Sequence, residues 1–333
     1  MPPPSSSGPP EHRRPPRPQA CSAMWDGASE AAWGSAAPAT FWVALEQPGP
    51  WGHRALTQSR LDRRIGAAIE GRAAAAGGRA LLIRSVGEHR ATPNQPLKRR
   101  VLLSGGMSHG QPWLLTGVIL DPGELLGLPW DTLAGPDSGP AQAALPVLAP
   151  STTPVVLVCT NSKRDTCCAI RGRAVARAAA ERRPGQVWEC THCGGHRFAA
   201  TGIVLPSGHT LGRLTADLAA NVLDAAAEDR MDPAQLSPVH NRGFSHLRPP
   251  AQAAEAFVRA LIGEADVCAL AVDIERPADS DDGEWLIGVR HRDGRFWSVA
   301  VREQTSPILR RNACSTDPVP TRSWQARLLS SRD

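Results

Sequence analysis

The chain has 333 residues, of which 37 are Lys or Arg and 32 are Asp or Glu, and its formal net charge is +5. Only Lys98 and Lys163 are lysines and Tyr is absent, a bias typical of GC-rich bacterial genomes. The basic residues form no stripe with interleaved aromatics, so nucleic-acid binding is not expected. No apolar run is long enough to cross a bilayer, and the N-terminus lacks the apolar segment of a signal peptide. We therefore expect a cytoplasmic protein with no membrane partner.

The first part of the chain mixes strand and helix patterns. Residues 1–20 are mostly Pro, Ser and Arg and are predicted to form a disordered tail. Residues 21–133 are predicted to form an α/β segment of unknown role, with a helix at 61–75 and strands at 40–45, 80–84, 101–104 and 113–120. Residues 134–150, rich in Ala, Pro and Gly, are predicted to be a linker.

Residues 151–264 are predicted to form a second unit. It opens with an apolar run at 154–159, which is typical of a central strand covered on both faces. The patterns that follow predict a helix, a short strand, a hairpin and two helices, at 171–182, 186–190, 198–213, 215–228 and 250–262. Strand, helix, strand, hairpin, helix is a thioredoxin-like layout, so the predicted fold class is α/β (α+β).

Residues 265–333 are predicted to form a C-terminal extension. Two strand patterns, 285–290 and 295–301, flank Asp293-Gly294, and Asp-Gly is a strong turn signal between two antiparallel strands. The extension is therefore predicted to carry a β-hairpin.

Cysteine and histidine crowd into one part of the chain. The stretch from Cys159 to His196 holds five of the eight cysteines and two of the ten histidines. Thiolate ligands suit zinc, Cu(I) and iron–sulfur clusters, and imidazole suits zinc and iron. In a chain without a secretory signal, such crowding predicts a metal centre rather than a disulfide framework.

Several motifs in and around this stretch resemble those of a known family. They are Val158-Cys-Thr, Arg164-Asp-Thr-Cys-Cys168, His192-Cys-Gly-Gly-His-Arg-Phe198, the turn Glu46-Gln-Pro-Gly-Pro-Trp-Gly52, and Arg242-Gly243. Together they resemble the sucrase/ferredoxin-like proteins, over about Cys21 to Trp324. The resemblance implies a thioredoxin-like ferredoxin with a [2Fe–2S] cluster, whose ligands would be Cys159, Cys168, His192 and His196.

The remaining residues of interest receive more ordinary predictions. Cys190 and Cys193 are departures from the family pattern and make an additional Cys-x-x-Cys. Asp165 is expected to orient the loop and Arg164 to act through its charge. Cys167 is expected to pack or to be a spare ligand. Lone cysteines are most often small buried hydrophobes, which is the prediction for Cys21, Cys268 and Cys314, whereas surface positions are predicted for His209, His240 and His246.

Three functions compete at this point. The leading one is an electron carrier, rather than an enzyme, with a two-Cys, two-His [2Fe–2S] cluster and proton-coupled redox chemistry. Since no nucleotide-binding motif is visible, its electrons would come from a redox partner protein or a small reductant. The first alternative is a structural zinc domain that uses Cys190 and Cys193 with Cys159 and one of the Cys167/Cys168 pair. The second is a thiol–disulfide oxidoreductase that uses Cys190 and Cys193.

Overall fold

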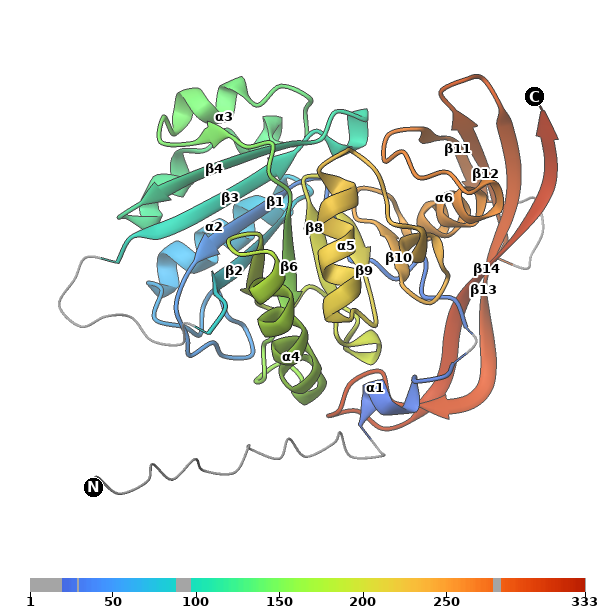
Figure 1. Ribbon diagram of the computed structural model, residues 1–333, viewed down its shortest axis with the longest axis horizontal. Coiled ribbons are helices and arrows are strands. Elements are labelled where there is room, and N and C mark those ends of the chain that lie inside the picture. Colours follow the sequence, from blue (N-terminus) through green and yellow to red (C-terminus); the bar gives the residue numbers. More distant parts are fainter. Residues whose placement is uncertain (1–19, 29, 88–96, 278–282, 333) are drawn as a thin grey trace, which may run out of the picture.

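The computed structural model describes residues 20–28, 30–87, 97–277 and 283–332 (Figure 1). The tail predicted to be disordered lies outside the described residues, apart from residue 20. Among the described helices, none is both long enough and apolar enough to cross a membrane.

The described helices and strands alternate along most of the chain. The α-helices are α1 (Cys21–Met24), α2 (Arg63–Ala75), α3 (Gly139–Ala144), α4 (Thr166–Arg182), α5 (Ala216–Ala226) and α6 (Pro249–Ile262). Short 3-10 helices are η1 (Met107–His109), η2 (Pro122–Gly127), η3 (Trp130–Thr132), η4 (His196–Phe198) and η5 (Pro233–Leu236). The strands are β1 (Trp42–Glu46), β2 (Arg79–Ser85), β3 (Arg99–Gly105), β4 (Trp113–Ile119), β5 (Ala149–Pro150), β6 (Val155–Cys159), β7 (Val187–Cys190), β8 (Gly202–Leu205), β9 (His209–Leu211), β10 (Asn241–Phe244), β11 (Leu270–Pro277), β12 (Trp285–His291), β13 (Phe296–Arg310) and β14 (Val319–Arg332).

One mixed sheet runs through both predicted units. Its strand order is β10-β9-β8-β6-β7-β2-β1-β3-β4-β5. Strands β6 and β7 are parallel, β8 and β9 form the predicted hairpin beside β6, and β2 pairs antiparallel with β7. The structure thus confirms the α+β class and the predicted order strand, helix, strand, hairpin, helix. The segment 134–150, predicted to be a linker, carries α3 and the edge strand β5.

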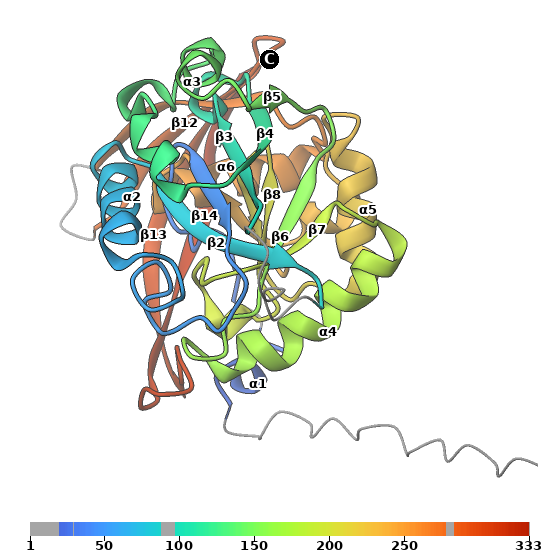
Figure 2. The same ribbon diagram turned by 90° about the vertical axis from the view of Figure 1, so that its left-hand side faces the viewer.

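Side chains of β6 alternate between two cores. Val156 and Val158 pack with α4 and α5 on one face of the sheet, and the figures show these two helices lying side by side along it (Figures 1 and 2). Leu157 and Cys159 point to the opposite face, into a second core that also contains Cys168. Because successive side chains of a strand point to opposite faces, the position of Cys159 follows from the register of this buried strand.

Helix α4 begins earlier than the sequence pattern suggests. A helix is predicted from residue 171, but the structure starts it at Thr166. The Asp165 carboxylate accepts a hydrogen bond of 2.8 Å from the backbone N–H of Cys167 and so caps the helix. Cys167 and Cys168 therefore lie in the first helical turn.

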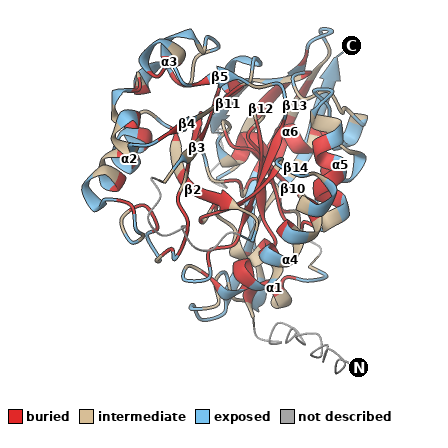
Figure 3. Cartoon of the chain, turned by 60° about the vertical axis from the view of Figure 1, so that its left-hand side comes forward, coloured by how far each residue is buried: buried red, intermediate tan, exposed pale blue. Residues whose placement is uncertain are grey.

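The C-terminal extension forms a separate four-stranded antiparallel sheet, β11-β12-β13-β14. The predicted hairpin corresponds to β12 and β13, while β11 and β14 are additional strands. This sheet packs against α6 through Val258, Val289 and Val299, among other side chains. Figure 3 shows buried residues concentrated along the central strands and on the sides of the helices that face them. The far part of the β13–β14 hairpin reaches down beside α1 (Figure 1).

Candidate metal centre

The four predicted ligands meet at one end of the central strands. Cys159 is the last residue of β6, while His192 and His196 follow the end of β7. The carboxyl ends of these parallel strands lie at the same sheet edge, since Cys159 is paired in register with Cys190. Cys168 approaches the same place from the first turn of α4.

Each cysteine of this group lies beside one histidine. The Sγ atom of Cys159 is 4.0 Å from Nδ1 of His192, and that of Cys168 is 3.9 Å from Nδ1 of His196. The two imidazole rings are stacked, with centroids 4.1 Å apart and planes inclined by 11°. Cys159, Cys168 and His192 have donor atoms within 4.8 Å of one another. His196 meets the same distance limit with Cys168 and Asp165. The two groups share Cys168, and together they supply two thiols and two imidazoles that could hold a metal ion or cluster.

Burial keeps the two imidazoles neutral. It is the main reason that the pKa of His192 falls to about 3, and the neighbouring His196 lowers it further. Burial also lowers the pKa of His196. A neutral imidazole has a free nitrogen lone pair, which is what a metal ligand needs. For Cys159, hydrogen bonds with Cys168 and Cys193, together with burial, raise the pKa of the thiol, and a bound metal would reverse this by displacing the proton.

Two glycines shape the loop that carries the histidines. Gly194 and Gly195 have φ values of 95° and 71°, a region that favours glycine. A Cβ atom on Gly195 would lie 2.5 Å from the guanidinium carbon of Arg242. Arg242 is fully buried and donates hydrogen bonds to the Gly194 carbonyl, at 3.1 Å, and to Ser35. The glycines therefore let a buried cation lie directly against the histidine loop.

Arg242 also supplies positive charge behind the thiols. Burial lowers its pKa to about 10, while the neighbouring Cys193, Cys159 and Cys168 oppose that shift. The guanidinium therefore stays protonated near neutral pH, and its charge favours thiolate over thiol at the site.

A buried ion pair fixes the loop that follows Cys159. Arg84 and Glu189 form a salt bridge of 2.5 Å with both side chains almost fully buried. The same Glu189 oxygen accepts a 2.8 Å hydrogen bond from the hydroxyl of Thr160, the residue after Cys159. The guanidinium carbon of Arg84 lies over the Trp51 ring, 4.1 Å from the centroid of that ring. The turn containing Trp51, far away in sequence, in this way helps to support the candidate metal centre.

Comparison with models of protein families shows to which family the chain belongs. The model of the family described as "Sucrase/ferredoxin-like" matches residues 32–237, which contain all four candidate ligands. The chain belongs to the sucrase/ferredoxin-like family. Comparison with curated proteins gave no significant match, and neither did comparison with solved structures.

The cysteines that depart from the family pattern are buried beside this centre. Cys190 and Cys193 have exposed fractions of 0% and 1% and are not joined by a disulfide. Cys193 lies 3.5 Å from the Thr201 hydroxyl. Among the described residues, neither belongs to a group of three or more donors that could share one metal ion. A thiol–disulfide oxidoreductase needs a thiol that a substrate disulfide can reach, and both of these thiols are buried.

The predictions for the other cysteines are correct only in part. Cys21 is buried as predicted, but Cys268 is exposed and Cys314 is half-buried. Cys268 lies just before β11, the edge strand of the C-terminal sheet. Cys167 points away from the histidines and toward Cys21 and Cys314.

The predictions for three histidines need correction. His209 is buried, not on the surface, because β9 is covered on both faces. Its Nε2 is 2.9 Å from Asn241 Oδ1, and its Nδ1 accepts a 3.0 Å hydrogen bond from Gln235. His240 and His246 are half-buried. No feature of the local sequence indicated the two polar partners of His209, which lie 26 and 32 residues further along the chain.

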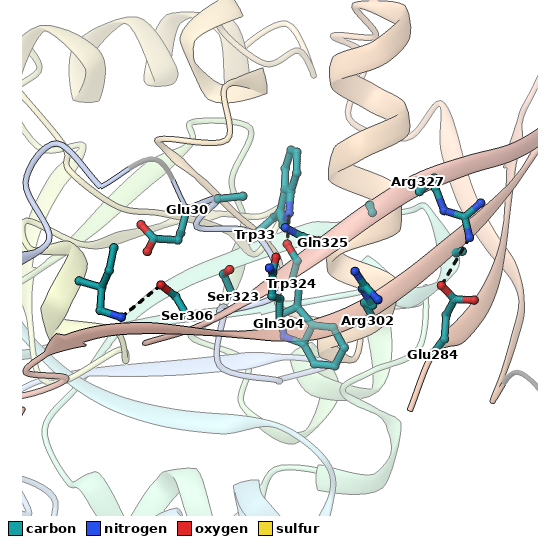
Figure 4. Close-up of a pocket in the computed structure, with 14 residues that line it drawn as sticks. Glu30, Trp33, Glu284, Arg302, Gln304, Ser306, Ser323, Trp324, Gln325 and Arg327 are labelled. Atoms are coloured by element: carbon teal, nitrogen blue, oxygen red, sulfur yellow. Dashed lines mark hydrogen bonds and ion pairs between the residues drawn. The ribbon is translucent and has the colours of Figure 1, made fainter. Parts of the chain in front are cut away.

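The C-terminal extension carries a groove of about 640 Å³ beside β13 and β14. Figure 4 shows Trp33, Trp324 and Arg302 among its lining side chains, and none of the four family-matched ligands contributes to it. The groove is therefore separate from the candidate metal centre.

Proposed function

We propose that the protein is a one-electron carrier in which Cys159, Cys168, His192 and His196 hold a [2Fe–2S] cluster. The observation that carries the proposal is the paired arrangement of the two thiols and two stacked imidazoles at one sheet edge. Membership of the sucrase/ferredoxin-like family supports it. When bound, such a cluster supplies a one-electron couple whose potential is raised when neutral imidazole replaces thiolate.

The residues around the ligands suit this role. Arg242 places a buried positive charge near Cys159 and Cys168, which favours a more negatively charged, reduced centre. His192 and His196 are half-buried and the cysteines fully buried, so the histidine side of the centre is the one that reaches the surface. A redox partner protein or small reductant would therefore approach over the histidines.

The histidines can also hold or release a proton. In both rings Nδ1 faces a cysteine sulfur, which leaves Nε2 directed away from the thiols. A ligand histidine with one nitrogen on the metal and the other near solvent can lose its second proton, so that electron and proton transfer become coupled.

The test is the absorption spectrum and iron content of the full chain made in iron-replete cells, with an EPR spectrum after dithionite reduction. The wild-type protein should be red-brown and contain about two iron atoms. Cys159→Ser and Cys168→Ser should each lose the iron, because a site with one thiolate fewer holds it poorly.

Cys268→Ser is the matched control, because Cys268 is exposed and outside the centre; it should keep the iron. A colourless wild-type protein that binds zinc through Cys159 and Cys168 would favour the structural zinc alternative.

A further inference from the structure

A second group of sulfur atoms lies outside the centre described above. Cys21 of α1, Cys167 of α4 and Cys314 of the β13–β14 turn come together with Asp165. The sulfur–sulfur distances are 3.5 Å for Cys21–Cys167, 3.2 Å for Cys167–Cys314 and 3.6 Å for Cys314–Cys21. Both Asp165 carboxylate oxygens are 3.7 Å from the Cys21 sulfur. Cys21 and Cys314 lie outside the residues that match the family model.

The two adjacent cysteines of α4 belong to different groups of side chains. Consecutive residues of a helix point about 100° apart, since a turn takes 3.6 residues. Cys168 therefore faces His196, while Cys167 faces Cys21 and Cys314. The Cys167 group has its own small apolar surround, in which Ala199 packs against Cys21 and Cys167.

The geometry is that of a ligand set for one thiophilic ion. Tetrahedral zinc has Zn–S bonds of about 2.3 Å, which places two ligand sulfurs about 3.8 Å apart. The Cys21–Cys167 and Cys314–Cys21 separations are about 0.2–0.3 Å shorter than this, and the Cys167–Cys314 separation is about 0.6 Å shorter. Three thiols converge here, and two of them, Cys21 and Cys167, are fully buried. The group therefore differs from a lone cysteine that packs as a small hydrophobe.

Asp165 completes the set, and its carboxylate also lies within 4.8 Å of donor atoms of Cys168 and His196. Its two oxygens accept 2.8 Å hydrogen bonds from the backbone N–H groups of Cys167 and Cys314. Each carboxylate oxygen keeps a further lone pair, so Asp165 can bind an ion while it orients two of the cysteine ligands.

We propose that Cys21, Cys167, Cys314 and Asp165 form a second metal site, which binds Zn²⁺. Binding displaces to solvent the protons that the cysteines still carry and leaves three thiolates and one carboxylate around the ion. The site joins segments that lie 146, 147 and 293 residues apart. The ion therefore anchors α1 and the β13–β14 turn to the first turn of α4, which carries Cys168.

Zinc and iron are measured together on the full chain, produced in medium that contains both metals. The wild-type protein should hold about one zinc, whether or not it holds a cluster. Cys21→Ser and Cys314→Ser should bind zinc at least ~10-fold more weakly in competition with a chromophoric chelator, and should keep the iron of the first centre. Cys314 is half-buried, so its substitution is the one less able to disturb the fold.

Two controls separate this site from the first. Cys159→Ser should lose iron and keep the zinc, whereas Cys268→Ser should keep both. Zinc retained in Cys21→Ser and Cys314→Ser but lost in Cys159→Ser would overturn the proposal, because the zinc would then occupy the first centre. A wild-type protein that binds no zinc would also overturn it. So would a Cys167–Cys314 disulfide, seen by mass spectrometry after anaerobic purification and alkylation.

Discussion

The outward nitrogens of two residues, His192 and His196, make the proposed redox couple sensitive to pH. Both rings are half-buried and turn Nδ1 toward a thiol. Reduction adds negative charge next to the imidazoles and raises the pKa of the outward nitrogen. Between the pKa of the oxidised form and the higher pKa of the reduced form, each electron should bring one proton and the midpoint potential should fall by ~59 mV per pH unit. Below the pKa of the oxidised form the potential should be constant.

Voltammetry from about pH 6 to 10 measures this dependence, since the range extends well above the pKa of an ordinary histidine. His192→Cys, if it keeps the iron, should have a lower potential and a weaker slope, because one titrating ligand is gone. A wild-type potential that stays constant over the whole range would count against solvent-facing histidine ligands.

His209 should make the folded protein sensitive to acid. Its burial lowers its pKa to about 4, below the 6.5 of an ordinary histidine. Because the folded pKa is the lower one, the stabilising contribution is complete above pH 6.5 and is lost as the pH falls toward 4. As the pH falls from 7 to 5, His209 becomes protonated in the unfolded chain but not in the folded one, and the free energy of unfolding should fall by about 2 kcal/mol.

Urea denaturation at the two pH values measures the loss. His209→Gln has no titrating group and should lose less stability on acidification than the wild type, while His109→Gln, at an exposed histidine, is the control. Equal losses in wild type and His209→Gln would show that other groups dominate.

At the scale of elements, Gly172 sets the distance between α4 and β6. A Cβ atom at this position would lie 2.1 Å from the Cys159 carbonyl oxygen. Gly172→Ala must therefore push the helix and strand apart, at a cost of about 1–3 kcal/mol. Since Cys168 lies on that helix and Cys159 on that strand, the variant should also hold less iron.

The matched control is Gly71→Ala in α2, where a Cβ atom would meet nothing within 4 Å. There the change should stabilise the protein by about 1 kcal/mol, because alanine favours helix. Thermal melting and iron content of the two variants provide the comparison. A Gly172→Ala protein as stable as wild type would contradict the close approach.

Elements with strong local patterns are predictable from the sequence, and those set by distant contacts are not. The apolar run of β6 corresponds closely to its predicted range, and the hairpin of β8 and β9 forms where it is predicted, although its first strand begins at Gly202 rather than at residue 198. Strand β14 is rich in Arg and Ser and is held mainly by pairing with β13, so its own residues give little signal. The four-ligand motif is local enough to recognise, whereas Cys21 and Cys314 meet Cys167 only after the whole chain has folded.

At the scale of the whole molecule, the two halves share one hydrogen-bonded sheet. Strand β7 has β6 on one side and β2, from the N-terminal half, on the other. A fragment of residues 151–264 would expose β7 as an unpaired edge next to the apolar core that contains Trp188. Exposed edges of this kind recruit other chains.

We therefore expect the fragment 151–264 to aggregate under conditions in which the full chain is soluble. Size-exclusion chromatography with light scattering distinguishes the two. A monomeric fragment that binds iron would show that the second unit folds alone.

Because the two halves share one sheet, the structure should stay together even where the chain between them is cut. The halves are linked covalently only through residues 134–150, where Pro136 and Asp137 are exposed, but they are joined by the β2–β7 ladder and by a common core. A protease that cuts at Pro136 or Asp137 should thus release nothing, because exposed loops are cut without loss of the contacts on either side. The cut protein would elute as one species until it is denatured. Two pieces divided at this loop and produced separately would associate with each other.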